Sequence, residues 1–221
     1  MKLLALETAN EQCSVSLIDE NQSLFFQLDQ RAKAQTQTIL PMIEQALQQT
    51  CTEVADLAAI AFSRGPGSFS GVRINAAVTQ ALAWSNDVSV IPVSTLQALA
   101  QAAYRQHQLQ QVTAVLDARM SEVYIASFQL DAQGIMQAVD EEKLLSYGAA
   151  ADYQKFSLIG SGAHLIDAVE TQYGAITPNA EDIATLAKPL ALAGQGLAAE
   201  LALPVYLRDD AWKKIPEQGK A

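Results

Sequence analysis

Residues 3–28 read LLALETANEQCSVSLIDENQSLFFQL, and residues 113–136 read TAVLDARMSEVYIASFQLDAQGIM. In each stretch a short apolar run ends at an acidic residue, Glu7 or Asp117, and is followed by a tight polar turn, an alternating strand, an acidic turn and a further apolar segment. This pattern is typical of a β-meander. Because the same order occurs twice, we interpret the chain as two α/β halves that share one plan.

The sequence between the two meanders alternates between helical and strand patterns. Apolar residues recur at helical spacing in residues 39–47, which predicts an amphipathic helix that starts near residue 35. Apolar runs and Ala-rich stretches predict a strand at 57–63, a helix at 69–84, a strand at 88–93 and a helix at 95–104. A polar break at 106–111 then predicts an N-terminal subdomain over residues 1–106 and a C-terminal subdomain over residues 107–221, whose tail packs back on the first.

Composition limits the classes of function. The 221 residues are 50% apolar, which is enough for a packed core, and carry 14 Lys and Arg against 24 Asp and Glu, for a net charge of −10. An acidic chain repels phosphate, so any contact with RNA would have to be local or belong to a partner. Two cysteines are too few for a disulfide framework, and the N-terminus does not resemble a secretion signal, so we expect a cytoplasmic protein.

The most distinctive motif is RGPGSFSG at residues 64–71. Ser68 or Ser70 can cap the helix that begins near Phe69, and such a helix start can bind an anion with help from Arg64 or Arg73. The motif is not a Walker A loop, because no Gly-Lys-Ser/Thr follows, and it is not a nucleophile elbow. A purely structural strand-to-helix turn remains open as the alternative.

The duplicated carboxylates are the second candidate site. Glu7 and Asp117 each end a strand before a tight turn, where they could hold a magnesium-bound phosphate between the two halves, with Arg119 as a further anion contact. The alternative is that each carboxylate only caps its own turn. The two histidines, His107 and His164, are 57 positions apart and form no cluster, so we predict neither a metal ligand set nor a catalytic residue.

The helix at residues 72–84 has apolar or small side chains on nearly every face. Such a helix is either enclosed within one subunit or has a face that meets a partner. The predicted interface residues are Ile39, Met42, Ile43, Ala46, Val72, Ala76, Ala77, Ala81 and Trp84.

Several of these motifs together resemble the bacterial TsaB (YeaZ) family of the actin-like ATPase superfamily. They are LALETA at 4–9, ILPMI at 39–43, RGPGSFSGVRI at 64–74, DARMSEVY at 117–124 and PVYLR at 204–208. The resemblance implies an actin-like ATPase fold with two RNase H-like subdomains, each a mixed β-sheet flanked by helices. It also implies a role in making N6-threonylcarbamoyladenosine in tRNAs that read codons beginning with adenine.

In that family TsaB is a non-catalytic subunit that supports its paralogue TsaD, which transfers the threonylcarbamoyl group, together with the ATPase TsaE. TsaD-like proteins bind a metal through a His-x-x-x-His pair, whereas residues 34–39 here read AQTQTI. The resemblance therefore implies a scaffold without its own cofactor, with ATP or ADP at the joint with TsaD, tRNA contacted only indirectly and a homodimer through the same helices. The alternative is an actin-like ATPase or peptidase-like enzyme that acts by itself.

Overall fold

The structure is a computed structural model that describes residues 1–20, 22–31, 33–168 and 172–208. Its first sheet has the strand order β3-β2-β1-β4-β5. The strands are β1 (Lys2–Glu7), β2 (Cys13–Ile18), β3 (Ser23–Asp29), β4 (Leu57–Gly65) and β5 (Ser89–Ser94). The first three are antiparallel, as the meander predicted, and β4 and β5 run parallel to β1.

The second sheet has the order β10-β6-β7-β8, and β9 pairs with a further part of β7. Its strands are β6 (Gln111–Arg119), β7 (Glu122–Leu130), β8 (Met136–Ala138), β9 (Lys143–Ser146) and β10 (Leu158–Ile159). The hairpin of β6 and β7 is antiparallel, and β10 runs parallel to β6. Two mixed sheets flanked by helices confirm the α/β fold class. We call the parts of the molecule built on them the first and the second lobe.

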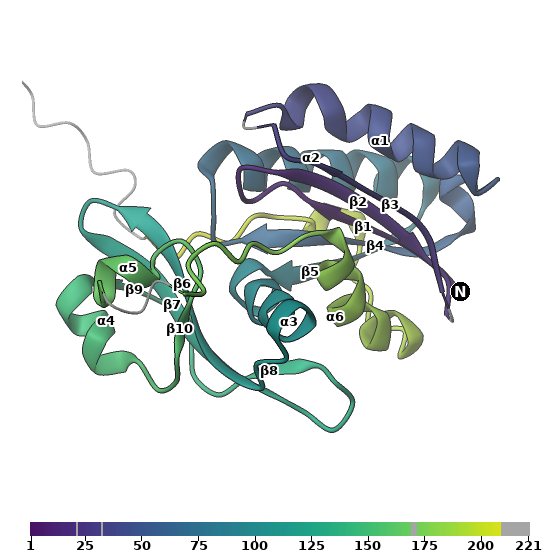
Figure 1. The fold of residues 1–221 in the computed structure, drawn as a ribbon. Coiled ribbons are helices and arrows are strands. Elements are labelled where there is room, and N and C mark those ends of the chain that lie inside the picture. Colours follow the sequence, from purple (N-terminus) through teal and green to yellow (C-terminus); the bar gives the residue numbers. More distant parts are fainter. Residues whose placement is uncertain (21, 32, 169–171, 209–221) are drawn as a thin grey trace, which may run out of the picture.

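Helices cover both faces of the first sheet and join the two lobes (Figure 1). α1 (Gln35–Gln49) and α2 (Phe69–Asn86) lie on one face, and α6 (Ala180–Leu192) lies on the other. α3 (Thr95–His107) packs between the sheets, whereas α4 (Tyr147–Tyr153) and α5 (Ala163–Ile166) belong to the second lobe. Two short 3-10 turns, η1 (Val54–Asp56) and η2 (Ala199–Leu201), complete the described elements.

The chain returns to the first lobe after the second sheet. α6 packs on β1, β2, β4 and β5, and η2 packs on α2 and β5. A bridge between Val90 and Leu197 adds this return segment to β5. The subdomain boundary at 106/107 therefore separates the strands of the two sheets, but not all of the helices that cover them. The predicted tail beyond residue 208 lies outside the described residues.

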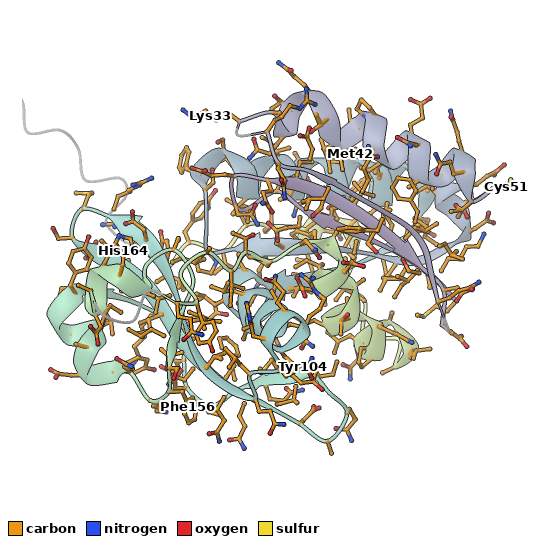
Figure 2. All side chains as sticks on the ribbon, in the orientation of Figure 1. Lys33, Met42, Cys51, Tyr104, Phe156 and His164 are labelled. Atoms are coloured by element: carbon orange, nitrogen blue, oxygen red, sulfur yellow. The ribbon has the colours of Figure 1, made fainter. Side chains whose placement is uncertain are left out.

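The core follows the alternation of β1. Leu4 and Leu6 face the layer of α1 and α2, whereas Leu3 and Ala5 face α6 on the opposite side. All four side chains are fully buried because helices cover both faces of this central strand. A third apolar cluster, formed by α3 and the second sheet, fills the space between the lobes. Figure 2 shows side chains throughout this interior.

The predicted partner interface needs a correction. Six of its residues lie in the core of this chain and are at most 4% exposed: Ile39, Met42, Ile43, Ala46, Val72 and Ala76. The periodic face of α1 covers β2 and β3, and one face of α2 covers β4, so these side chains are enclosed within the subunit. Ala77, Ala81 and Trp84 point outward from α2 and are exposed.

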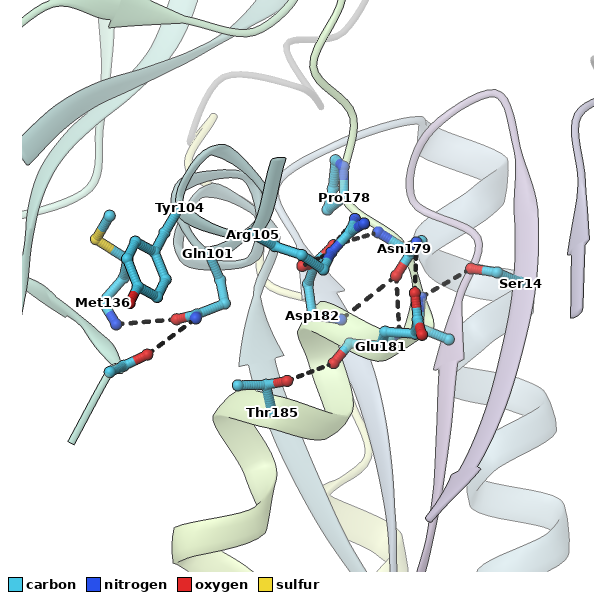
Figure 3. Close-up of polar contacts among 12 residues, drawn as sticks. Ser14, Gln101, Tyr104, Arg105, Met136, Pro178, Asn179, Glu181, Asp182 and Thr185 are labelled. Atoms are coloured by element: carbon cyan, nitrogen blue, oxygen red, sulfur yellow. Dashed lines mark hydrogen bonds and ion pairs between the residues drawn. The ribbon is translucent and has the colours of Figure 1, made fainter. Parts of the chain in front are cut away.

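α3 is tied to both lobes by two polar side chains, which Figure 3 shows reaching to different sides of the helix. In the second lobe, Gln101 accepts a hydrogen bond from the backbone N–H of Met136 at 3.0 Å and donates one to the carbonyl oxygen of Gly134 at 3.0 Å. One turn further along, Arg105 donates two hydrogen bonds to the carboxylate of Asp182 on α6, at 2.8 and 3.0 Å.

Candidate functional site

Glu7 is the most perturbed titratable group of the predicted site. It ends β1, it is fully buried, and its carboxylate accepts a hydrogen bond from the backbone N–H of Ala9. Burial raises its pKa from 4.5 to about 7, although the Ser63 hydroxyl and the backbone N–H groups of Ala9 and Asn10 lower it. The buried side chain therefore caps its own turn. This is the alternative to a phosphate site that the sequence analysis left open.

The glycine motif forms a strand-to-helix turn that packs directly on the turn between β1 and β2. Ser68 is the N-cap of α2, and its hydroxyl accepts a hydrogen bond from the N–H of Gly71 at 3.4 Å. The Ser68 backbone N–H donates to the carbonyl oxygen of Ala9 at 2.7 Å, and the Thr8 hydroxyl donates to the carbonyl oxygen of Gly71 at 2.8 Å. Ser70, which follows in the first helical turn, is exposed.

The glycines are required by this contact. A Cβ atom at Gly67 would collide with the carbonyl oxygen of Ala9, and one at Gly71 would collide with that of Thr8. Two carbonyl oxygens thus lie directly against the loop, on the sides of Gly67 and Gly71 where a Cβ atom would stand. The residues present do not fit a magnesium-bound phosphate at this position, because carbonyl oxygens repel phosphate oxygens and the Ser68 N–H is already used.

Asp117 and Arg119 lie at the end of β6, next to the turn that leads into β7. The Asp117 carboxylate forms an ion pair with the Arg119 guanidinium at 2.9 Å and accepts a hydrogen bond from the Arg119 backbone N–H at 2.8 Å. The Arg119 side chain is 83% exposed. Within the described ranges no hydrogen bond or ion pair joins Glu7 to Asp117. Each strand-end carboxylate instead binds groups of its own segment.

Arg64 occupies the end of β4 and contacts the second lobe. Its guanidinium lies 3.7 Å from the Glu142 carboxylate, and its carbonyl oxygen accepts a hydrogen bond from the N–H of Val205. It is thus engaged between the lobes and does not point at the start of α2 as an anion-binding donor.

Sequence reasoning missed Asn75, which organises this region. Asn75 lies on the buried face of α2, and its amide nitrogen donates to the carbonyl oxygen of Leu6 at 3.1 Å and to the hydroxyl of Ser63 at 2.7 Å. One side chain therefore joins α2 to β1 and β4. The sequence contains a pattern that could have identified it, because the polar Asn75 lies between the apolar positions Val72 and Ala76 of a helix.

The outward face of α2 carries exposed aromatic and cationic side chains. The Arg73 guanidinium lies 3.3 Å from the centre of the Phe69 ring and 5.1 Å from that of Tyr206. Phe69 is 63% exposed and Trp84, at the other end of the helix, is 67% exposed. Exposed aromatic residues and arginine are typical of protein contact surfaces.

The histidines lie apart. The His107 ring contacts the Tyr173 ring at a tilt of 60°, with ring centres 5.2 Å apart, whereas His164 is exposed on α5 (Figure 2). Among the described residues, no group of three or more His, Cys, Asp and Glu side chains could hold a metal ion. No helix of the described chain is long and apolar enough to cross a membrane.

Comparison with known proteins decides the family. The family model of TsaD, tRNA N6-adenosine threonylcarbamoyltransferase, matches residues 29–209. The tRNA threonylcarbamoyladenosine biosynthesis protein TsaB of Escherichia coli K12 is 37% identical over 230 aligned positions, which cover 98% of this chain and 99% of that protein. The chain belongs to the TsaB family.

Further relatives extend this result. TsaB of Haemophilus influenzae is 35% identical and covers 98% of both chains. The solved structure of YeaZ from Pseudomonas aeruginosa matches with a TM-score of 0.85 at 37% identity, over 93% of this chain and 99% of that one. The match spans both lobes, so the resemblance to TsaB and the two-subdomain actin-like fold are confirmed.

Proposed function

We propose that this TsaB-family chain takes part in the biosynthesis of threonylcarbamoyladenosine in tRNA as a non-catalytic subunit. Its role is to support the transferase TsaD, together with TsaE, in the cytoplasm. The names of the full-length relatives support the pathway. The subunit role is our inference from the site.

The observation that carries the subunit role is the direct contact between the glycine loop and the β1–β2 turn. The Ser68 N–H donates to the Ala9 carbonyl oxygen and so is used within the chain, and the carbonyl oxygens of Ala9 and Thr8 lie directly against Gly67 and Gly71. Asp117 is paired with Arg119 at the end of β6. These contacts favour a chain whose nucleotide-type site has become structural, with any ATP or ADP bound at the joint with TsaD.

The outward face of α2 is the surface that we propose for the partner. Ala77 and Ala81 are small and exposed, so another helix could approach α2 closely between Arg73 and Trp84. The same face could join two copies of this chain when TsaD is absent. The net charge of −10 supports a complex in which the partner holds most of the tRNA.

A reconstitution experiment tests the proposal. The purified chain, TsaD and TsaE are combined singly and together with threonylcarbamoyl-adenylate and unmodified tRNA, and the modified nucleoside is quantified by mass spectrometry. We expect no modification by the chain alone, little without the chain and robust modification by the full set. Modification by this chain alone would contradict the proposal and favour an independent enzyme.

A further inference from the structure

Residues 202–208, which we call the strap, cross from the first lobe to the second (Figure 1). The strap begins at η2, which is fixed to α2 by a hydrogen bond from Gln80 to the carbonyl oxygen of Ala199 at 3.4 Å. In its middle, the N–H of Val205 donates to the carbonyl oxygen of Arg64 at the end of β4, at 2.8 Å. Both of these hydrogen bonds tie the segment to the first lobe.

Arg208 then binds the second lobe. Its guanidinium lies 2.6 Å from the carboxylate of Glu122 and donates a hydrogen bond to the carbonyl oxygen of Ala118 at 3.2 Å. The side chains of Arg208 and Glu122 are only 21% and 31% exposed, so water and salt screen this pair less than a surface pair. One arginine side chain thus binds both strands of the β6–β7 hairpin.

Gly65 allows the strap to lie directly on β4. Its φ is +102°, a conformation that favours glycine, and a Cβ atom there would lie 3.1 Å from the carbonyl oxygen of Val205. The ion pair between Arg64 and Glu142 crosses the lobe junction at the same place. The strap is therefore fitted to this junction along its length.

The opposite side of the junction is formed by α3. Gln101 binds the second lobe and Arg105 binds α6 of the first, so this helix remains attached to both. A two-lobed protein joined on one side by a helix and on the other by arginine ion pairs opens where those pairs release, and the shorter of the two pairs is Arg208–Glu122, at 2.6 Å against 3.7 Å for Arg64–Glu142.

We propose that the strap is a latch that holds the two lobes at one angle, with α3 as the hinge. Release of Arg208 from Glu122 frees the second lobe to turn about α3. This inference concerns the isolated chain and does not depend on the proposed role in tRNA modification.

Spin labels on the two lobes test the latch. Cys51 is exposed at the end of α1 in the first lobe, Cys13 is buried, and Ala151→Cys provides an exposed site on α4 in the second lobe. We expect one narrow label-to-label distance distribution in the latched chain. Arg208→Ala and Glu122→Gln should both broaden it and shift it to other distances.

Arg119→Ala is the matched control, because it breaks an arginine–carboxylate pair that lies within β6 of the same hairpin and does not cross the lobes. It should leave the distance distribution unchanged. Hydrogen exchange at the Val205 amide provides a second readout and should become about tenfold faster in Arg208→Ala than in Arg119→Ala. Glu122→Gln hardly changes the side-chain volume, so it tests the latch even where Arg208→Ala destabilises the chain. An unchanged distribution in Glu122→Gln, or equal broadening in Arg119→Ala, would overturn the proposal.

Discussion

The backbone N–H of Ser68 donates a hydrogen bond to the carbonyl oxygen of Ala9 across 2.7 Å. This contact joins the two segments that the sequence had singled out as anion-binding candidates, the β1–β2 turn and the glycine loop. Because the two segments form hydrogen bonds with each other, both contribute to the stability of the first lobe.

Gly71→Ala should destabilise the chain, because the added Cβ atom meets the carbonyl oxygen of Thr8. We expect the free energy of unfolding to fall by about 1–3 kcal/mol. Gly148→Ala is the control, since Gly148 lies in α4 and has no atom within 4 Å of an added Cβ atom. Urea denaturation of both variants provides the measurement. If the urea midpoint of Gly71→Ala equals or exceeds that of the parent chain, the turn can accommodate a Cβ atom at position 71 and the prediction is wrong.

The stability of the chain should decrease as the pH rises from about 4.5 to about 7. Over this interval the folded chain retains a proton on Glu7 that the unfolded chain has lost, because burial raises the pKa of this carboxyl. The loss of stability from this group is on the order of 3 kcal/mol and is complete above pH 7.

Glu7→Gln should remove that part of the pH dependence, since the amide has nearly the same shape and does not titrate. Burial also raises the pKa of Asp182, so some dependence of the same sign will remain in the variant. Urea titrations of both proteins at pH 5 and pH 8 measure the difference. Parallel pH profiles for the two proteins would contradict a buried, proton-binding Glu7.

Arg105→Ala should destabilise the chain more than any loss of a surface ion pair. Asp182 is 1% exposed and would lose two hydrogen bonds from the guanidinium. We expect a loss of about 2–4 kcal/mol, because the carboxylate would remain buried without its cation.

Arg31→Ala is the matched control, because it removes the ion pair between Asp29, at the end of β3, and an arginine side chain that is 72% exposed. Its unfolding midpoint should not change measurably. A double-mutant cycle with Asp182→Asn isolates the coupling between Arg105 and Asp182. Additive effects of the two substitutions would show that the pair contributes nothing beyond packing.

Ala77→Arg and Ala81→Glu should each weaken the association of the chain with TsaD, because the new side chain stands on the proposed contact face of α2. The expected loss of affinity is at least tenfold, equivalent to about 1.4 kcal/mol. Ala151→Arg on α4 is the control, since Ala151 is equally classed as exposed but lies in the second lobe. Pull-down and sedimentation assays give the result. If all three variants bind like the parent chain, α2 is not the contact.

The two cysteines should differ in reactivity. Cys51 is exposed, whereas Cys13 is buried on β2 and burial raises the pKa of its thiol to about 11. A thiol reagent should therefore label Cys51 within minutes in the native chain and Cys13 only after unfolding. Equal rates for the two thiols would contradict the packing of β2 against α1.

Much of the fold could be predicted from the sequence. The alternation of residues 13–17 and the helical spacing of residues 39–47 specify local structure, because side-chain direction follows the backbone period. The same pattern did not say what covers each apolar face. The sequence analysis predicts that Ile39 and Val72 contact a partner protein, but both side chains are buried against the sheet of their own lobe.

The sequence by itself determined the strands, the helices, the glycine loop and the membership in a family. Only the tertiary structure decided that Ser68 meets Ala9, that Arg105 meets Asp182 and that Arg208 meets Glu122. Periodicity is a local property of the backbone, whereas the partner of a buried polar group depends on which distant segment the packed core brings beside it. The loop predicted as an anion site instead makes a structural contact, because the packed core brings the β1–β2 turn beside it.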